Sequence, residues 1–128
     1  MPFVRISLRE GTTPEYRKAI AAGVQQAIME AIAAPAADRF QIITEHKPDD
    51  MIYDPSYLGI NRSDKLVFVQ ITMSTGRKPR QKRVLFKRMS ELLAKSPGVR
   101  PKDLLVNLVE VSWENWSFGN GEAQYQMD

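Results

Sequence analysis

Three residues of this sequence carry groups suited to acid–base or electrostatic chemistry: Pro2, Asp38 and Arg77. Pro2 follows Met1, so removal of the methionine would leave a secondary amine rather than an amide at the end of the chain. A free α-amino group titrates near pH ~8, and the neutral amine can accept a proton or add to an aldehyde to form an iminium. The alternative interpretation is that a proline after Met1 only permits removal of the methionine.

Arg77 and Asp38 carry charges that could accompany such an amine. Arg77 lies between an apolar strand and a helix, near the point where we expect Pro2 to begin a neighbouring parallel strand. A guanidinium there can hold a carboxylate in a bidentate pair beside helix-start amides, or it can simply be solvated. Asp38 could activate a water or set the charge of Pro2. It could equally be a turn aspartate, as the presence of Asp103 at the equivalent position suggests.

The composition excludes several classes of site and favours one globular domain. The chain has 128 residues, 43% of them hydrophobic, and a net charge of +3. It contains no cysteine, which excludes disulfides, thiol nucleophiles and zinc–thiolate sites, and its single histidine, His46, is expected to be structural or exposed. We therefore expect no metal and no cofactor. No apolar run approaches the ~18 residues of a membrane span, and no signal peptide is evident, so a cytoplasmic location is expected.

The elements that would position these residues occur twice, 65 residues apart. FVRISLREGTTP begins at Phe3 and FVQITMSTGRKP begins at Phe68. The identical pairs are Phe3/Phe68, Val4/Val69, Ile6/Ile71, Gly11/Gly76, Pro14/Pro79, Asp38/Asp103 and Glu45/Glu110. Each copy has an alternating strand, a glycine turn, a helix with proline in its first turn, and a second strand. This order predicts two βαβ units, each with parallel strands and a right-handed crossover.

The periodicity gives the extent of each element. The first helix starts within residues 12–15 and the second near residues 78–79, each with an apolar stripe. The stripes are Ile20, Val24, Ile28 and Ile32 in the first helix, and Leu85, Met89, Leu92 and Leu93 in the second. The second strands are expected at Arg39 to Glu45 and Leu104 to Val111.

We therefore predict one α/β domain over residues 1–128, with a four-stranded sheet and both helices on one face. Its parts are repeat one at 2–46, a linker at 47–65, repeat two at 66–111 and a tail at 112–128. Because the other face of the sheet also carries apolar residues, burial against further copies of the chain is expected. The tail WENWSFGNG is rich in aromatic residues and could reach a neighbouring subunit.

With its Met-Pro start and paired βαβ units, the sequence resembles the tautomerase superfamily, whose members use an amino-terminal proline as the catalytic group. The stretches APAADRFQIITEHKP and VEVSWENWSFGNGEAQY, with the chain length, resemble the malonate semialdehyde decarboxylase branch. The resemblance covers essentially the whole chain. It implies a homotrimer in which three sheets surround a barrel-like core.

Carried over to this sequence, the resemblance assigns Pro2, Asp38 and Arg77 to catalysis on a small oxo- or enol-carboxylate. The decarboxylase pattern has two arginines after the third strand, and here one is Arg77 while the other position holds Thr75. Thr75 could donate a hydrogen bond instead. The aromatic residues of the tail could wall the site or form a core or an interface; these are Trp113, Trp116 and Phe118. Decarboxylation, keto–enol tautomerisation and hydration all remain open.

A basic run offers a competing interpretation. Its cations are Arg77, Lys78, Arg80, Lys82, Arg83, Lys87 and Arg88. Such a run can bind phosphate backbones, but apolar residues interrupt it at helical spacing, which favours one helix with a solvated face. No nucleic-acid motif accompanies it, so nucleic acid is an unlikely partner. A catalytically silent oligomer is the third alternative.

Overall fold

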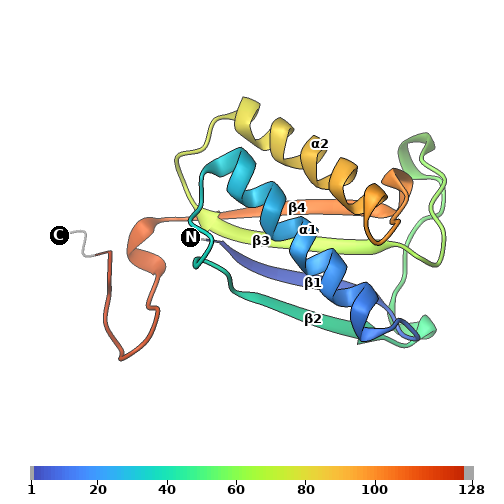
Figure 1. The fold of residues 1–128 in the computed structure, drawn as a ribbon, viewed down its shortest axis with the longest axis horizontal. Helices are drawn as coiled ribbons and strands as arrows, with labels where there is room; N and C mark the ends of the chain where they lie inside the picture. Colours follow the sequence, from blue (N-terminus) through green and yellow to red (C-terminus); the bar gives the residue numbers. More distant parts are fainter. Residues whose placement is uncertain (1, 126–128) are drawn as a thin grey trace.

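Two helices cover one face of a four-stranded sheet in a computed structural model of the chain (Figure 1). The structure describes residues 2–125. In chain order the elements are β1 (Phe3–Arg9), α1 (Pro14–Ile32), β2 (Gln41–His46), β3 (Val67–Ser74), α2 (Pro79–Lys95) and β4 (Leu104–Val111). The predicted α/β fold of two βαβ units is therefore confirmed, with both helices on the same side of the sheet.

The strand order is β2-β1-β3-β4, and the two βαβ units meet in the middle of the sheet. β1 is parallel to β2 and β3 is parallel to β4, whereas β1 and β3 are antiparallel, with Phe3 opposite Thr72 and Leu8 opposite Val67. The expectation that Pro2 begins a strand parallel to β3 is wrong. Because β1 and β2 are parallel, both end at the same end of the sheet. Segment 47–65 connects β2 to β3 at that end, so β3 starts there and runs antiparallel to β1.

Each helix buries the stripe that the sequence predicted. Ile20, Val24 and Ile28 of α1 are fully buried, as are Leu85 and Met89 of α2. Burial of such side chains is worth about 1.5–3 kcal/mol each, so this shared core holds the two helices on the sheet.

The two helices approach each other closely at Gly23. A Cβ atom placed there would lie 2.7 Å from Cδ2 of Leu93 on α2. A side chain at this position would force the helices apart, which explains a glycine in the interior of a helix where it is otherwise unfavourable.

The repeat is visible in polar contacts as well as in apolar ones. Arg17 on α1 pairs with Glu45 on β2 at 3.3 Å, and Lys82 on α2 pairs with Glu110 on β4 at 2.6 Å. These two pairs occupy equivalent positions 65 residues apart. Both link a helix to the edge strand of its own unit, so the two halves are built alike.

The sheet face away from the helices is open in the protomer. Ile42, Leu105 and Val109 expose 45%, 40% and 37% of their surface. Segment 47–65 adds Ile52, which is 87% exposed. Among residues 2–125 no helix has the length and apolar character needed to cross a membrane.

Candidate active site

A cavity of about 490 Å³ lies at the end of the sheet where β1 begins and β3 ends. Its walls come from the segment before β2, the turn before α2 and the tail after β4. The lining residues are Ala33, Ala34, Pro35, Ala37, Asp38, Phe40, Arg77, Trp113 and Tyr125. Two residues far apart in the sequence, Asp38 and Arg77, thus face one space.

Pro2 lies at the same edge, buried at the start of β1. The amide of Val4 donates a hydrogen bond to the carbonyl oxygen of Phe40 at 2.9 Å, which ties this end of β1 to the wall of the cavity. The β1–β3 register, continued by one residue from Phe3 and Thr72, sets Pro2 opposite Met73. Pro2 is not one of the lining residues, and Met1 lies outside the described residues.

Arg77 is half-buried between the end of β3 and the start of α2. Its Nη1 donates only a long hydrogen bond, 3.5 Å, to the carbonyl oxygen of Ser74. Within residues 2–125 it forms no ion pair with a carboxylate. Most of its five N–H donors are therefore available to a ligand in the cavity.

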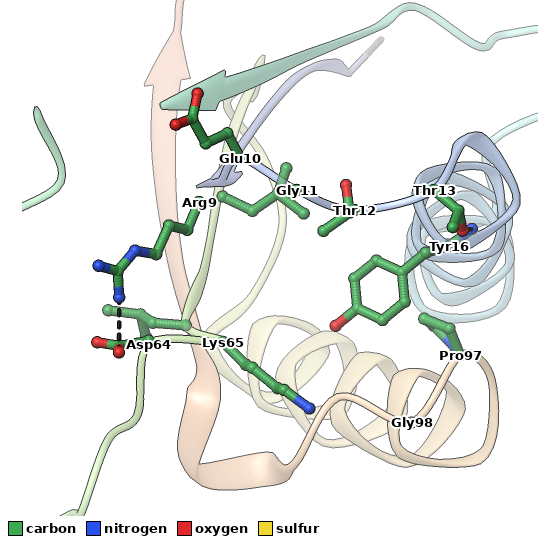
Figure 2. Close-up of a pocket in the computed structure, with 12 residues that line it drawn as sticks. Arg9, Glu10, Gly11, Thr12, Thr13, Tyr16, Asp64, Lys65, Pro97 and Gly98 are labelled. Carbon is green, nitrogen blue, oxygen red and sulfur yellow. Dashed lines mark hydrogen bonds and ion pairs between the residues drawn. The ribbon is translucent and has the colours of Figure 1, made fainter. Parts of the chain in front are cut away.

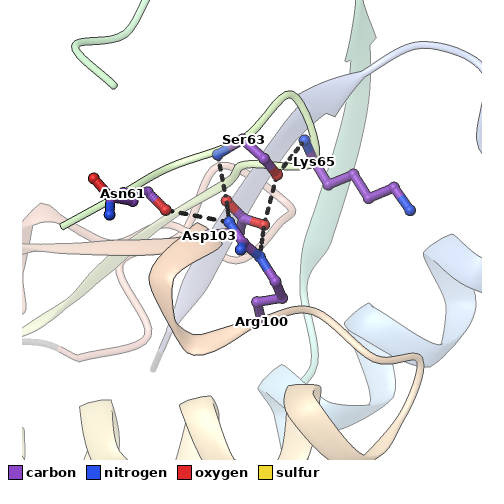
Figure 3. A network of polar contacts seen from close by, with 5 residues as sticks. All are labelled: Asn61, Ser63, Lys65, Arg100 and Asp103. Carbon is purple, nitrogen blue, oxygen red and sulfur yellow. Dashed lines mark hydrogen bonds and ion pairs between the residues drawn. The ribbon is translucent and has the colours of Figure 1, made fainter. Parts of the chain in front are cut away.

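The repeat supplies an internal comparison for Asp38, because Asp103 occupies the equivalent place in the second unit. Asp103 accepts hydrogen bonds from the amide and hydroxyl of Ser63 at 2.7 and 2.8 Å and from Nε of Arg100 at 2.9 Å (Figure 3). Burial would raise the pKa of Asp103, but the bonds from Arg100 and Ser63 outweigh it and hold the pKa below its usual value. Asp103 is a structural anchor.

Asp38 is in a different state. Burial raises its pKa above the usual value, and the positive charge of Arg77 opposes that shift only in part. The backbone around it is held in place, since its amide bonds Pro35 at 3.0 Å and its carbonyl accepts from Gln25 at 3.2 Å. Asp38 thus combines a raised pKa with a place beside a guanidinium in the lining of a cavity, an arrangement found at many functional sites.

Five aromatic rings surround this edge. Trp113 and Tyr125 meet edge to face with centroids 4.9 Å apart, and Phe118 meets Tyr125 in the same way at 5.4 Å. Phe118 also stacks with Trp116 and with Phe40, at centroid distances of 5.3 and 6.5 Å. Trp113 and Tyr125 line the cavity, whereas Trp116 and Phe118 do not.

Two indole hydrogen bonds fasten the tail to the end of β3. Nε1 of Trp116 donates to Oγ of Ser74 at 2.9 Å, and Nε1 of Trp113 donates to the carbonyl oxygen of Thr75 at 3.2 Å. Thr75 itself is exposed, and its amide bonds Val111 at 3.0 Å. These bonds hold the start of the tail on the end of β3, and Thr75 contributes its backbone to them.

Two lining residues were not singled out from the sequence. Phe40 directly follows Asp38-Arg39, and Tyr125 closes the aromatic tail, so both lay within stretches already recognised. Phe40 and Tyr125 are far apart in the sequence, and only the three-dimensional structure shows that both line this cavity. Burial and the negative charge of Asp38 raise the pKa of Tyr125, so its hydroxyl stays protonated and able to donate a hydrogen bond.

The basic run on α2 is partly neutralised. Lys82 pairs with Glu110, and Arg88 pairs with Glu30 of α1 at 2.8 Å. Arg77 faces the cavity. Three of the seven cations of the run are thus assigned to ion pairs or to the lining of the candidate site.

The two equivalent aspartates make a matched experiment. Asp103→Ala is expected to lower the free energy of unfolding by about 2–3 kcal/mol at pH 7, because it removes the buried carboxylate that accepts the hydrogen bonds of Ser63 and Arg100. Asp38→Ala should cost no more than about 1 kcal/mol, because burial already disfavours the charge of that carboxylate. Urea unfolding of both variants and the wild type measures the difference.

The pH dependence supplies the control. The pKa of Asp103 is lower in the folded protein than its ordinary 3.8, so its stabilisation is present above that pH and is lost as the pH falls toward the folded value. The gap between wild type and Asp103→Ala should therefore narrow near pH 3. Equal destabilisation by both substitutions at pH 7 would mean that Asp38 is also a structural anchor.

The sequence matches one family of known proteins. Two family models, both described as tautomerase enzyme, match residues 2–61 and residues 38–119. The chain belongs to the tautomerase family. A probable tautomerase of Bacillus subtilis (strain 168), YusQ, is 35% identical over 97% of this chain and 98% of its own length.

Solved structures confirm the resemblance to the malonate semialdehyde decarboxylase branch of the tautomerases. FG41 malonate semialdehyde decarboxylase, inhibited by 3-bromopropiolate, is 39% identical with a TM-score of 0.91, over 96% of this chain and 93% of that one. Another malonate semialdehyde decarboxylase, studied for its decarboxylase and hydratase activities, is 32% identical with a TM-score of 0.90, over 96% and 95%. A fused 4-OT symmetric trimer, 22% identical with a TM-score of 0.77 over 94% of each chain, shares the fold.

Proposed function

We propose that this tautomerase acts on a small oxo- or enol-carboxylate, with Pro2 as the reacting amine after removal of Met1. The observation that carries this proposal is the shared edge. Asp38 and Arg77 come from two separate segments and line one cavity of about 490 Å³, and strand β1 begins at the same end of the sheet. A family model that begins its match at residue 2 supports the same assignment.

In this proposal Arg77 binds the substrate carboxylate and Pro2 does the chemistry. For tautomerisation, the neutral amine takes a proton from carbon and the protonated amine returns one, so the keto and enol forms interconvert without net change. For decarboxylation, the amine adds to the aldehyde and loses water to give an iminium. The electrons of the breaking C–CO₂ bond move into that iminium to form an enamine, which is then protonated and hydrolysed.

Asp38 and Thr75 take supporting roles. Asp38 holds a water or tunes the charge of Pro2, and its raised pKa fits a carboxyl group that exchanges protons. Thr75 stands where the decarboxylase pattern has a second arginine, so one carboxylate contact is absent. We therefore propose a malonate semialdehyde decarboxylase-like reaction that is weaker than that of the branch, with tautomerisation or hydration of 2-oxo or unsaturated acids as the alternatives.

Mass spectrometry of the intact purified chain tests the proposal. The expected mass is that of the chain without Met1. After incubation with an aldehyde acid and borohydride, an adduct should appear on the peptide that begins with Pro2, because borohydride reduces an iminium to a stable amine. A chain that keeps Met1 throughout, or an adduct found only on lysines, would contradict a catalytic Pro2.

We also propose that the protein is a homotrimer with the open sheet faces buried at its centre. Ile42, Leu105 and Val109 leave apolar surface exposed on the sheet face away from the helices. Sedimentation at micromolar concentration should give the mass of three chains. A single species with the mass of one chain would remove this proposal and leave the site of the protomer unaffected.

A further inference from the structure

A second cavity, of about 510 Å³, lies at the opposite edge of the sheet, where β1 ends and β3 begins (Figure 2). Its walls include Leu8, Tyr16, Lys65, Leu66 and Pro97. The internal repeat makes this cavity the counterpart of the candidate active site. The candidate active site lies where β1 begins and β3 ends, and the second cavity lies where β3 begins and β1 ends. The molecule therefore has one cavity at each end of the β1–β3 pair.

Most charges around the second cavity are already compensated. Arg9 pairs with Asp64 at 2.6 Å, and Asp64 also accepts a hydrogen bond from the hydroxyl of Tyr53 at 2.9 Å. Asp103 is held by Ser63 and Arg100, and the side chain of Glu10 extends away from the cavity (Figures 2 and 3).

Two side-chain donors in the lining of the cavity, those of Lys65 and Tyr16, are available to a ligand. Neither the ammonium group of Lys65 nor the hydroxyl of Tyr16 has a hydrogen bond or ion pair within residues 2–125, and both side chains border the cavity (Figure 2). Burial, with the nearby charge of Asp103, raises the pKa of Tyr16, so its hydroxyl stays protonated. A cation and a neutral donor beside buried Leu8 and Leu66 suit an anionic acceptor with a short apolar body.

We propose that this cavity is a second, non-catalytic binding site for a small aliphatic carboxylate. The carboxylate lies against Lys65 and Tyr16, and the apolar body packs on Leu8, Leu66 and Pro97. The site lacks a counterpart of the Pro2 amine, because Val67 occupies the equivalent position and its nitrogen is a backbone amide inside the chain. Thr12, the equivalent of Arg77, is already engaged, since its hydroxyl bonds Glu45 at 2.7 Å.

Titration of the isotopically labelled full chain with butyrate, followed by amide NMR shifts, tests this inference. The amides of Gly11 and Gly98, which line the cavity, should shift and saturate together with one Kd. Lys65→Gln should weaken that Kd at least about tenfold, because it removes a charge-assisted hydrogen bond. Tyr16→Phe should weaken it less. Arg77→Ala should leave the shifts of Gly11 and Gly98 unchanged.

Lys87→Gln is the matched control for loss of one positive charge, since Lys87 is exposed on α2 and does not line the cavity. It should bind butyrate like the wild type. Two outcomes would overturn the proposal: no shift of Gly11 and Gly98 at saturating butyrate, or equal weakening by Lys65→Gln and Lys87→Gln. Both are independent of turnover, so loss of the proposed function would not affect this test.

Discussion

Replacing Arg77 with alanine is expected to reduce kcat/KM for every oxo- or enol-carboxylate substrate by about 10²–10³-fold, the effect of removing one preorganised donor from an active site. The guanidinium would orient the carboxylate toward Pro2 and draw charge away from the reacting carbon. Steady-state kinetics with one oxo acid and one enol acid measure the loss. The free energy of unfolding should change little, because within residues 2–125 the Arg77 side chain donates one hydrogen bond, and that bond is long.

Arg80→Ala is the matched control. Arg80 is exposed on the first turn of α2, three residues after Arg77, and does not line the cavity, so its loss removes one positive charge without removing a ligand contact. It should keep nearly all the activity of the wild type. If Arg77→Ala turns over carboxylates as well as Arg80→Ala does, the carboxylate binds elsewhere and the assignment of this cavity fails.

A form of the protein that keeps an extension before Pro2 is expected to lose about 10²–10⁴-fold in kcat, the usual contribution of a positioned acid or base. In that form the nitrogen of Pro2 is an amide, which neither titrates near neutral pH nor forms an iminium. Pro2→Ala should retain part of the activity after removal of Met1, because alanine still presents a primary amine. A non-cleavable tag before Met1 and the Pro2→Ala variant can be compared directly by kcat.

The tagged form and the Pro2→Ala variant distinguish the contribution of the amine to turnover from the contribution of the cavity to binding. Both should still bind a non-reacting carboxylate through Arg77, with a Kd close to that of the wild type. If the tagged form is as active as the processed wild type, Pro2 is not the reacting group, and a different acid or base in the cavity must be sought, with Asp38 the first candidate.

Local signals in the sequence were sufficient for the secondary structure. Strand β4 begins and ends at the residues predicted, Leu104 and Val111, and helix α2 begins at the predicted Pro79. Strand β2 begins two residues later than predicted, at Gln41, because Arg39 and Phe40 still belong to the segment that passes the cavity. These elements follow from alternation, helical spacing and the glycine and proline at the turns, all of which act over a few residues.

The direction of the second unit could not be read from such signals. A βαβ unit looks the same whether its partner is parallel or antiparallel, and the parallel expectation for β1 and β3 was wrong. The direction of β3 depends on the end of the sheet at which segment 47–65 returns the chain to the sheet. The antiparallel choice has a functional consequence, because it brings the start of β1 and the end of β3, and hence Pro2 and Arg77, to the same edge.

By itself the sequence determined two βαβ units, their shared apolar core and the candidate residues Pro2, Asp38 and Arg77. Only the tertiary structure decided that Asp103 accepts hydrogen bonds from Ser63 and that Asp38 lines a cavity with Arg77, because these contacts join segments far apart along the chain. It also decided that Tyr125 completes the wall around Asp38. Contacts between residues far apart along the chain form only when the sheet brings them together, so no local pattern encodes them.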